Sequence, residues 1–174
     1  MSTWTIDGAH SEIAFKIKHL VISTVRGTFK KFSGVGIAAD DTFENAAINF
    51  TAETASIETN NEGRDEHLRG ADFFDSAIHP TINFVSTSFT KKDGNLFELV
   101  GDLTMKGVTK SVSLTTEFNG IGKNMGGQRF ASFNLSGTLN RNDFGLTWNS
   151  ILEMGGLALS EELVLEMTIE AIEE

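Results

Sequence analysis

The segment "LVLEMTIE", residues 163–170, decides the class of fold. Its Leu and Glu content is typical of a helix, but its apolar side chains recur at every second position. The two alternating sets are Leu163, Leu165, Met167 and Ile169, and Val164, Glu166, Thr168 and Glu170. Since successive side chains of a strand point to opposite faces, this spacing predicts a strand with one apolar face.

The same spacing recurs along most of the chain. In "SEIAFKIKHL", residues 11–20, the apolar positions are Ile13, Phe15 and Ile17. Turn-forming stretches such as "KDGN", residues 92–95, separate further segments of this kind. Seven or eight strands with one apolar face each, in about the order of the chain, favour closure of the sheet on itself.

We therefore predict one all-β domain over residues 1–174. It is an extended antiparallel β-barrel of about eight strands. Only residues 61–75 have the pattern of a short helix, so helices are too few to cover an open sheet.

Composition excludes several classes of protein and site. The chain has no Cys, which excludes disulfides, thiolate metal sites and Cys nucleophiles. A net charge of -10 argues against nucleic acid as a partner, because phosphate binding needs a basic face. With 14 Phe and no Tyr, the interior is expected to be strongly apolar.

The sequence carries no apolar run long enough to be an integral membrane segment. It opens "MSTWTIDGAH", without the basic and apolar regions of a secretory signal. We therefore expect a cytoplasmic protein, or a periplasmic one if a leader was removed.

Small residues interleave with large ones on the predicted inward faces. An eight-stranded barrel has an interior that side chains just fill or that holds one small ligand. Two interpretations stay open: an elongated apolar cavity, or a closed core in which large and small side chains interdigitate. The small inward residues are Ala46, Ala52, Ser86, Ser88, Gly101, Thr116, Ala131 and Gly137.

The densest polar cluster is "NNEGRDEHLRGADFFDSAIHP", residues 60–80. His67 and His79 are too far apart in sequence for a metal pair on one helix face. A structural interpretation accounts for more of the cluster: Asn60 or Asn61 caps a short helix, and Arg64 and Arg69 pair with Asp65, Asp72 or Asp75. Phe73 and Phe74 would then insert as a plug, so the segment forms a lid over one end of the barrel.

Five ordered blocks of sequence resemble the YceI-like family of lipocalin-like, polyisoprenoid-binding proteins. They are "WTIDGAHSEIAFKIKHL", "VRGTFKKFSG", "NNEGRDEHLRGADFFD" with the following "HP", "GDLTMKGVTKSVSL" and "NRNDFGL". The resemblance covers nearly the whole chain. It implies an extended β-barrel that binds a long apolar chain, such as a polyprenyl quinone-like lipid or a fatty amide. It also implies a homodimer, and no catalytic activity belongs to the lid block.

From these arguments we expect a carrier or sequestering protein, with no catalytic residue, no metal and no cofactor beyond a bound isoprenoid or acyl lipid. A polar head would lie at the mouth near Arg64, His67 or Asp72. Two alternatives remain: a filled barrel that serves as a structural or interaction module, and a metal-dependent or acid-base enzyme using His67, Asp72, His79 or His10. The residues expected around the apolar tail are Phe15, Ile17, Phe29, Phe50, Phe84, Leu103, Phe133 and Leu165.

Overall fold

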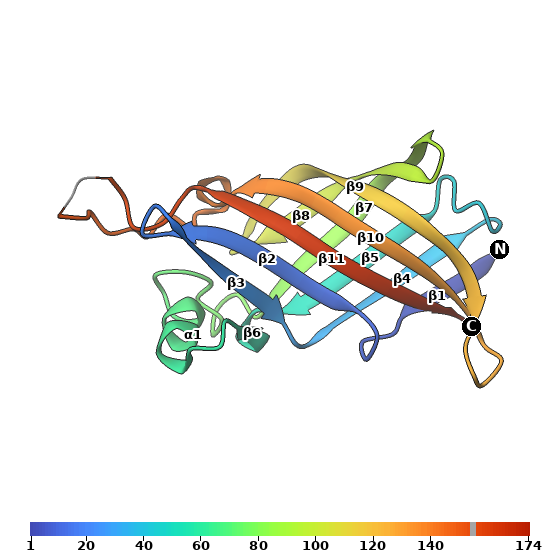
Figure 1. Cartoon of the computed structure of the whole chain (residues 1–174), viewed down its shortest axis with the longest axis horizontal. Coiled ribbons are helices and arrows are strands. Elements are labelled where there is room, and N and C mark those ends of the chain that lie inside the picture. Colours follow the sequence, from blue (N-terminus) through green and yellow to red (C-terminus); the bar gives the residue numbers. More distant parts are fainter. Residues whose placement is uncertain (154–155) are drawn as a thin grey trace.

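The backbone forms a closed antiparallel β-barrel (Figure 1). The structure is a computed structural model, and it describes residues 1–153 and 156–174. Its strands are β1 Ser2–Ile6, β2 Glu12–His19, β3 Ser23–Phe29, β4 Phe32–Ala38, β5 Ala47–Glu53, β6 Ile57–Glu58, β7 Thr81–Asp93, β8 Leu96–Met105, β9 Val108–Lys123, β10 Arg129–Asn140 and β11 Glu162–Glu173. The described helical segments are η1 Thr54–Ser56, η2 Arg141–Phe144 and α1 Glu62–Arg69.

Eleven strand segments occupy eight positions around the barrel. Segments β1 and β2 lie end to end against β11, β3 and β4 lie end to end beside them, and β5 and β6 form the next position. Strands β7 to β11 follow in order, and β1 pairs with both β4 and β11 to close the ring. The predicted barrel of about eight strands in chain order is confirmed.

Strand β11 contains the segment that decides the fold, and it closes the barrel. One of its edges pairs with β10 from Glu162 to Ile172. The other edge pairs first with β2 and then with β1. Hydrogen bonds on both edges leave β11 no exposed edge, which explains why a Glu-rich and Leu-rich segment is extended rather than helical.

The junction between β1 and β2 is a bulge held by specific hydrogen bonds. Residues 7–11 stand opposite only Ile169 and Glu170 of β11. The amide of Asp7 donates to the Glu170 carbonyl at 2.8 Å, and the Glu170 amide donates to Ser11 Oγ at 2.9 Å. An extra loop is therefore accommodated without leaving the backbone of β11 unpaired.

The helix is shorter than residues 61–75. Asn61 caps α1, because its side-chain oxygen accepts a hydrogen bond from the Arg64 amide at 3.0 Å. The helix ends at Arg69, and Gly70 begins a series of turns that continues toward β7. In these turns the Phe74 amide donates to the Leu68 carbonyl at 3.0 Å, which folds the chain back under the helix. The range predicted as helical, residues 61–75, therefore comprises the helix α1 and a compact series of turns after it.

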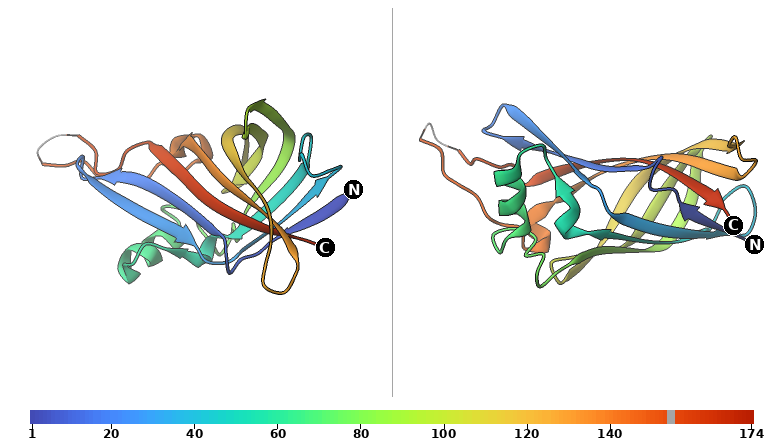
Figure 2. Two further views of the ribbon diagram at one scale, coloured as in Figure 1. Left: turned by 45° about the vertical axis from the view of Figure 1, so that its right-hand side comes forward. Right: turned by 90° about the horizontal axis from the view of Figure 1, so that it is seen from below.

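The two ends of the barrel differ. At one end lie α1, the β2–β3 hairpin and the loop between η2 and β11 (Figure 2). At the other end lie both termini and the β9–β10 hairpin. No helix in the described ranges is long and apolar enough to cross a membrane.

At two of the small inward residues, the space that a larger side chain would occupy is filled by a large neighbouring residue and is not available to a ligand. A Cβ atom on Gly101 would lie 2.3 Å from Cζ of Phe84 and 2.6 Å from the carbonyl oxygen of Val85. A Cβ atom on Gly137 would lie 2.6 Å from Cδ2 of Leu114. The interdigitated interpretation is therefore correct for these parts of the wall.

Ser88 does not face inward as predicted. It is exposed, because the pairing of β7 with β8 shifts register between Ser86 and Ser88. A bulge changes which face the following residues occupy, so alternation counted from Ser86 fails at this point.

The close contact at Gly101 predicts the effect of adding one methyl group. Gly101→Ala should lower the free energy of unfolding by about 1–3 kcal/mol, because Phe84 and the Val85 backbone cannot both move away. Gly36→Ala is the matched control, since its Cβ would meet no atom closer than 4.0 Å. Urea unfolding of both variants measures the difference, and equal stability of the two would contradict the proposed packing.

Candidate functional site: an apolar cavity

A cavity of ≈ 440 Å³ lies inside the barrel. Its wall is formed almost wholly by aliphatic and aromatic side chains, with a few polar residues that include Thr59, Arg64, His67 and Arg141. The structure places all eight residues predicted to surround an apolar tail in this wall: Phe15, Ile17, Phe29, Phe50, Phe84, Leu103, Phe133 and Leu165.

Aromatic rings close the cavity at the end where the termini lie. Phe43, in the loop between β4 and β5, points into the barrel and is buried. Its ring centroid lies 5.1 Å from that of Trp4 and 5.2 Å from those of Phe118 and Phe133. The backbone of Phe43 is left-handed, with φ 59°, a conformation that is uncommon for a bulky residue. The packing of its ring holds this strained turn in place.

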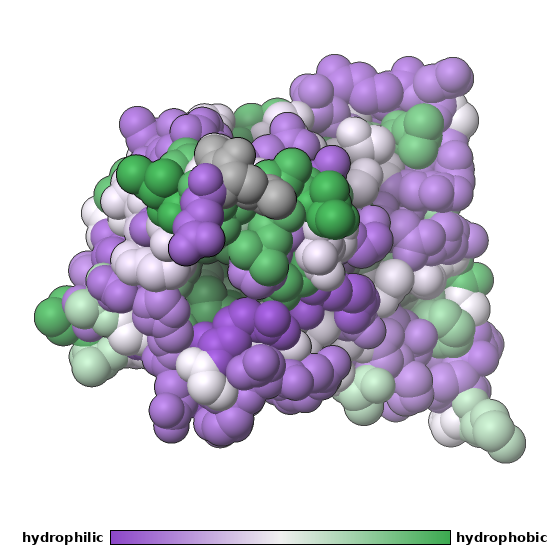
Figure 3. All heavy atoms as spheres, turned by 60° about the vertical axis from the view of Figure 1, so that its left-hand side comes forward, coloured by the Kyte–Doolittle hydropathy of each residue, from purple (hydrophilic) through white to green (hydrophobic). Residues whose placement is uncertain are grey.

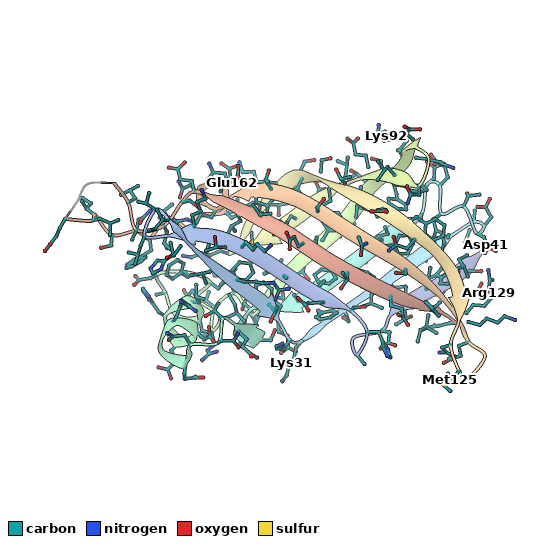
Figure 4. The ribbon with its side chains drawn as sticks, viewed as in Figure 1. Lys31, Asp41, Lys92, Met125, Arg129 and Glu162 are labelled. Carbon is teal, nitrogen blue, oxygen red and sulfur yellow. The ribbon has the colours of Figure 1, made fainter. Side chains whose placement is uncertain are left out.

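An ion-pair network covers the outside of this closed end. Arg129 donates to Asp41 at 2.7 Å and to Glu173 at 2.6 Å, and its guanidinium lies 5.7 Å from the centre of the Trp4 ring. Figure 4 labels Asp41 and Arg129 at this end of the barrel. Hydrogen bonding to Asp41, more than the charge of Glu173, raises the pKa of Arg129. The network joins β10, β11 and the β4–β5 loop.

The other end of the cavity is covered by the segment from α1 to β7. The His67 ring lies 5.0 Å from Phe73 and 4.7 Å from Trp148, both edge-on. Phe74 packs on Phe29 at 5.8 Å. The buried Phe73 and Phe74 support the lid interpretation. Because the His67 side chain lines the cavity and is also 40% exposed, this end is the mouth.

Of the three predicted mouth residues, Arg64 and His67 line the cavity and Asp72 does not. Asp72 lies outside it and bonds to His67, with Oδ2 2.8 Å from Nε2. This pair joins the last turn of α1 to the loop that carries Phe73. The His67–Asp72 pair is exposed and makes one side of the mouth polar.

The predicted ion pairs of the lid are wrong in their partners. Arg64 donates from Nε and from a terminal nitrogen to the side chain and carbonyl of Thr59, both at 2.7 Å. The buried Asp65 accepts from the amide of Thr59 at 2.9 Å and from its hydroxyl at 2.5 Å. Arg69 pairs with Glu62 at 3.1 Å. Thr59 therefore connects the two charges of Arg64 and Asp65, so that neither is left uncompensated.

Arg141 positions the outer wall of the mouth. It is 3% exposed, and it donates to the carbonyls of Ser160 at 2.8 Å, Leu146 at 2.6 Å and Trp148 at 2.9 Å. Burial lowers the pKa of its guanidinium, and the charge of Glu161 opposes that shift. The three carbonyls hold both sides of the loop between η2 and β11, so Trp148 is fixed against His67.

The two His residues of the lid cluster, His67 and His79, lie in different surroundings. His67 contacts Asp72, Phe73 and Trp148, whereas the His79 ring packs near Gly107, where an added Cβ would lie 3.3 Å from it. The described contacts of the two rings share no residue. The pairing of His67 with Asp72 is the part of the enzyme alternative that the structure brings together.

Sequence reasoning missed Phe43, Trp148 and Arg141 as parts of the site. Phe43 has a recognisable signal, since it is the one large apolar residue in the polar stretch "DDTFEN", residues 40–45. Trp148 and Arg141 depend on a loop whose path is set by tertiary hydrogen bonds, and no periodicity marks them.

A separate polar group lies on the barrel surface at the β1–β2 bulge. One side-chain nitrogen or carboxylate oxygen from each of Asp7, His10 and Glu170 lies within 4.8 Å of the other two. Asp7 Oδ2 is 2.7 Å from His10 Nδ1. The hydrogen bond with Asp7, helped by the charges of Asp7 and Glu170, raises the pKa of His10 against a smaller effect of burial. The same hydrogen bond lowers the pKa of Asp7.

Comparisons with known proteins agree with this architecture. A family model described as the YceI-like domain matches residues 4–171. A UPF0312 protein of Staphylococcus epidermidis (strain RP62A) is 41% identical over 172 residues, which cover 98% of this chain and 97% of that protein. A UPF0312 protein of Staphylococcus aureus (strain MSSA476) is 38% identical with the same coverage.

Solved structures share the fold. The YceI protein of Campylobacter jejuni matches with a TM-score of 0.77 and 32% identity over 90% of each chain. BcnA of Burkholderia cenocepacia matches with a TM-score of 0.80 and 21% identity over 95% of this chain and 98% of its own. A polyisoprenoid binding domain from Saccharophagus degradans matches with a TM-score of 0.73 and 10% identity over 97% of each chain.

The Asp7–His10 contact predicts a pH dependence. Asp7 has a lowered pKa, so its contribution to stability is present above the usual Asp value and is lost as the pH falls through the lowered one. His10 has a raised pKa, so its contribution is present below 6.5 and is lost as the pH rises through the raised value. Asp7→Asn should return the His10 pKa toward 6.5, as measured by NMR titration of the ring protons.

Glu170→Gln is the control for this titration. Glu170 affects His10 only through its charge, so this variant should lower the His10 pKa less than Asp7→Asn does. An unchanged pKa in Asp7→Asn would show that the hydrogen bond does not form in solution.

Proposed function

Because the chain belongs to the YceI-like domain family, we propose that it encloses the tail of one long apolar lipid in its barrel. Carriage, storage or sequestration of such a lipid in water is the function that this binding supports. The observation that carries the proposal is the apolar cavity of ≈ 440 Å³ between two aromatic clusters. Its volume lies within the usual range of ligand pockets, about 300–1,000 Å³.

The affinity of this site would come from burial of the tail. Each buried CH₂ group contributes roughly 0.8 kcal/mol, so a dozen carbons give about 10 kcal/mol. This gain lies within the range of the cost of association, about 4–15 kcal/mol, so each further buried CH₂ group adds directly to the net affinity. A wall of aliphatic and aromatic side chains selects a ligand by its length and width, because it offers no polar groups that would recognise the ligand's functional groups. The fitting ligand class is therefore broad: an isoprenoid, including quinone-like lipids, or an acyl chain such as a fatty amide.

The name of the Saccharophagus degradans domain, polyisoprenoid binding, is compatible with this class. At 10% identity its likeness shows the fold alone, so the proposal rests on the chemistry of the cavity. We place the polar head of the ligand at the mouth, near Arg64, His67 and Asp72. The homodimer and the cytoplasmic location remain predictions, and the sedimentation of the purified protein tests the first.

The proposal is tested by native mass spectrometry of gently purified protein, followed by extraction and identification of released lipid. A discrete added mass that extracts as an isoprenoid or acyl compound supports it. An unliganded mass that does not shift with added polyprenyl quinone or fatty amide would overturn it in favour of a barrel that acts as a scaffold.

A pair of neighbouring substitutions tests the location of the tail. Leu165 lines the cavity, whereas Val164 is adjacent on β11 and points to the opposite face. Leu165→Trp should weaken binding of a fluorescent long-chain lipid roughly tenfold or more, equivalent to about 1.4 kcal/mol, because the indole occupies tail volume. Val164→Trp should leave the affinity unchanged. Equal affinities in a titration of both variants would place the lipid outside the barrel.

A further inference from the structure

Two loops at the mouth end join into one projecting structure, which we call the tip. It comprises residues 20–22, between β2 and β3, together with Ile151 and Leu157 from the loop before β11. The Leu20 amide donates to the Ala158 carbonyl at 2.8 Å, and backbone bridges connect His19 with Leu159 and Ile151 with Leu157. In Figure 1 these loops project beyond the barrel, on the side away from the termini.

The tip exposes aliphatic side chains to water. Ile22 is 91% exposed and Ile151 is 83% exposed, and Leu20, Val21 and Leu157 are each about half exposed. Figure 3 shows apolar residues gathered at this end, with polar residues around them. Single exposed aliphatic residues are ordinary, but a group of this kind marks an interaction site.

The backbone of the tip is also unfavourable for the residues that it carries. Leu20 has φ 53° and Val21 has φ 69°. Hairpin turns with such angles usually carry Asn, Asp or Gly, and a β-branched residue there is an outlier. Both the exposure and the strain would be relieved by common polar turn residues. Strain of this kind concentrates at functional sites.

The tip is continuous with the wall of the cavity. His19 and Leu159, the bridged pair directly behind it, both line the cavity, as does Trp148 in the same loop. We propose that the tip inserts into the surface of a lipid bilayer and brings the mouth against it. A lipid tail then passes between bilayer and barrel along apolar side chains without crossing water. This role in transfer rests on the proposed function, whereas the docking itself does not.

The composition of the tip favours lipid over a second protein copy. Protein interfaces are enriched in aromatic residues, Met and Arg, whereas the tip residues defined above, which leave out residues 154–155, are Leu, Val and Ile. A projecting tip also enters a fluid layer without a matching groove. The exposed charged residues close to it in sequence include Lys18, Glu153, Glu161 and Glu162, and the chain has a net charge of -10. The structure thus fits a zwitterionic surface, which has no net charge, rather than an anionic one.

The test is flotation of the purified protein with phosphatidylcholine vesicles. The wild type should float with the vesicles, and the double variant Ile22→Ser, Ile151→Ser should partition at least about tenfold less. Met125→Ser is the matched control, because Met125 is fully exposed at the opposite end of the barrel (Figure 4) and should not affect flotation. Replacing part of the lipid with phosphatidylglycerol should not increase binding. Thermal unfolding verifies that all variants are folded.

Three results would overturn docking. The first is wild-type protein that does not float with the vesicles, and the second is an equal loss of flotation in Met125→Ser. The third is sedimentation showing that the wild type is a dimer and that the only effect of the double substitution is to separate it into monomers. Lipid capture in solution, followed by native mass spectrometry, is measured on the same proteins. Capture without flotation rejects docking and leaves the proposed function standing. Flotation without capture rejects the proposed function and leaves docking standing.

Discussion

The pairing of the first strand position with the last is the constraint on which the rest of the structure depends. Each strand has one apolar face, and the chain has too few helices to cover those faces, so the sheet buries them only by closing. Closure occurs where β11 pairs with β2 and then β1. Once the ring is closed, the apolar faces surround one interior, and the loops at its two ends decide whether that interior is sealed or accessible.

The two ends use similar chemistry for different results. Phe43 and Trp4 close the end near the termini with packed rings under the Arg129 network. At the mouth, rings again form the cover, but His67 and Trp148 are only partly buried there. The parts of this cover belong to α1 and to a separate loop, neither of which is a strand of the barrel. The asymmetry is the reason for placing the mouth of the cavity at this end.

Much of this was predictable because alternation is a local property. Period two in segments such as residues 163–170 predicted the antiparallel barrel without knowledge of any contact, and the eight residues predicted to surround an apolar tail all lie in the cavity wall. Prediction failed where a contact between distant segments sets the geometry. Ser88 is displaced by a bulge, Arg64 binds Thr59 rather than a carboxylate, and Arg141 determines the path of the loop that carries Trp148. None of these depends on a periodic pattern.

Closure by β11 has a consequence during synthesis. Strand β11, which completes the ring, is the last strand of the barrel to be made, and its partners β1 and β2 are the first. Until it emerges, β10 and the β1–β2 position keep unpaired edges, and the apolar faces have no enclosed interior. A message truncated before β11 would thus encode an open, aggregation-prone sheet instead of a slightly shorter barrel. Closure of the ring therefore depends on one twelve-residue strand.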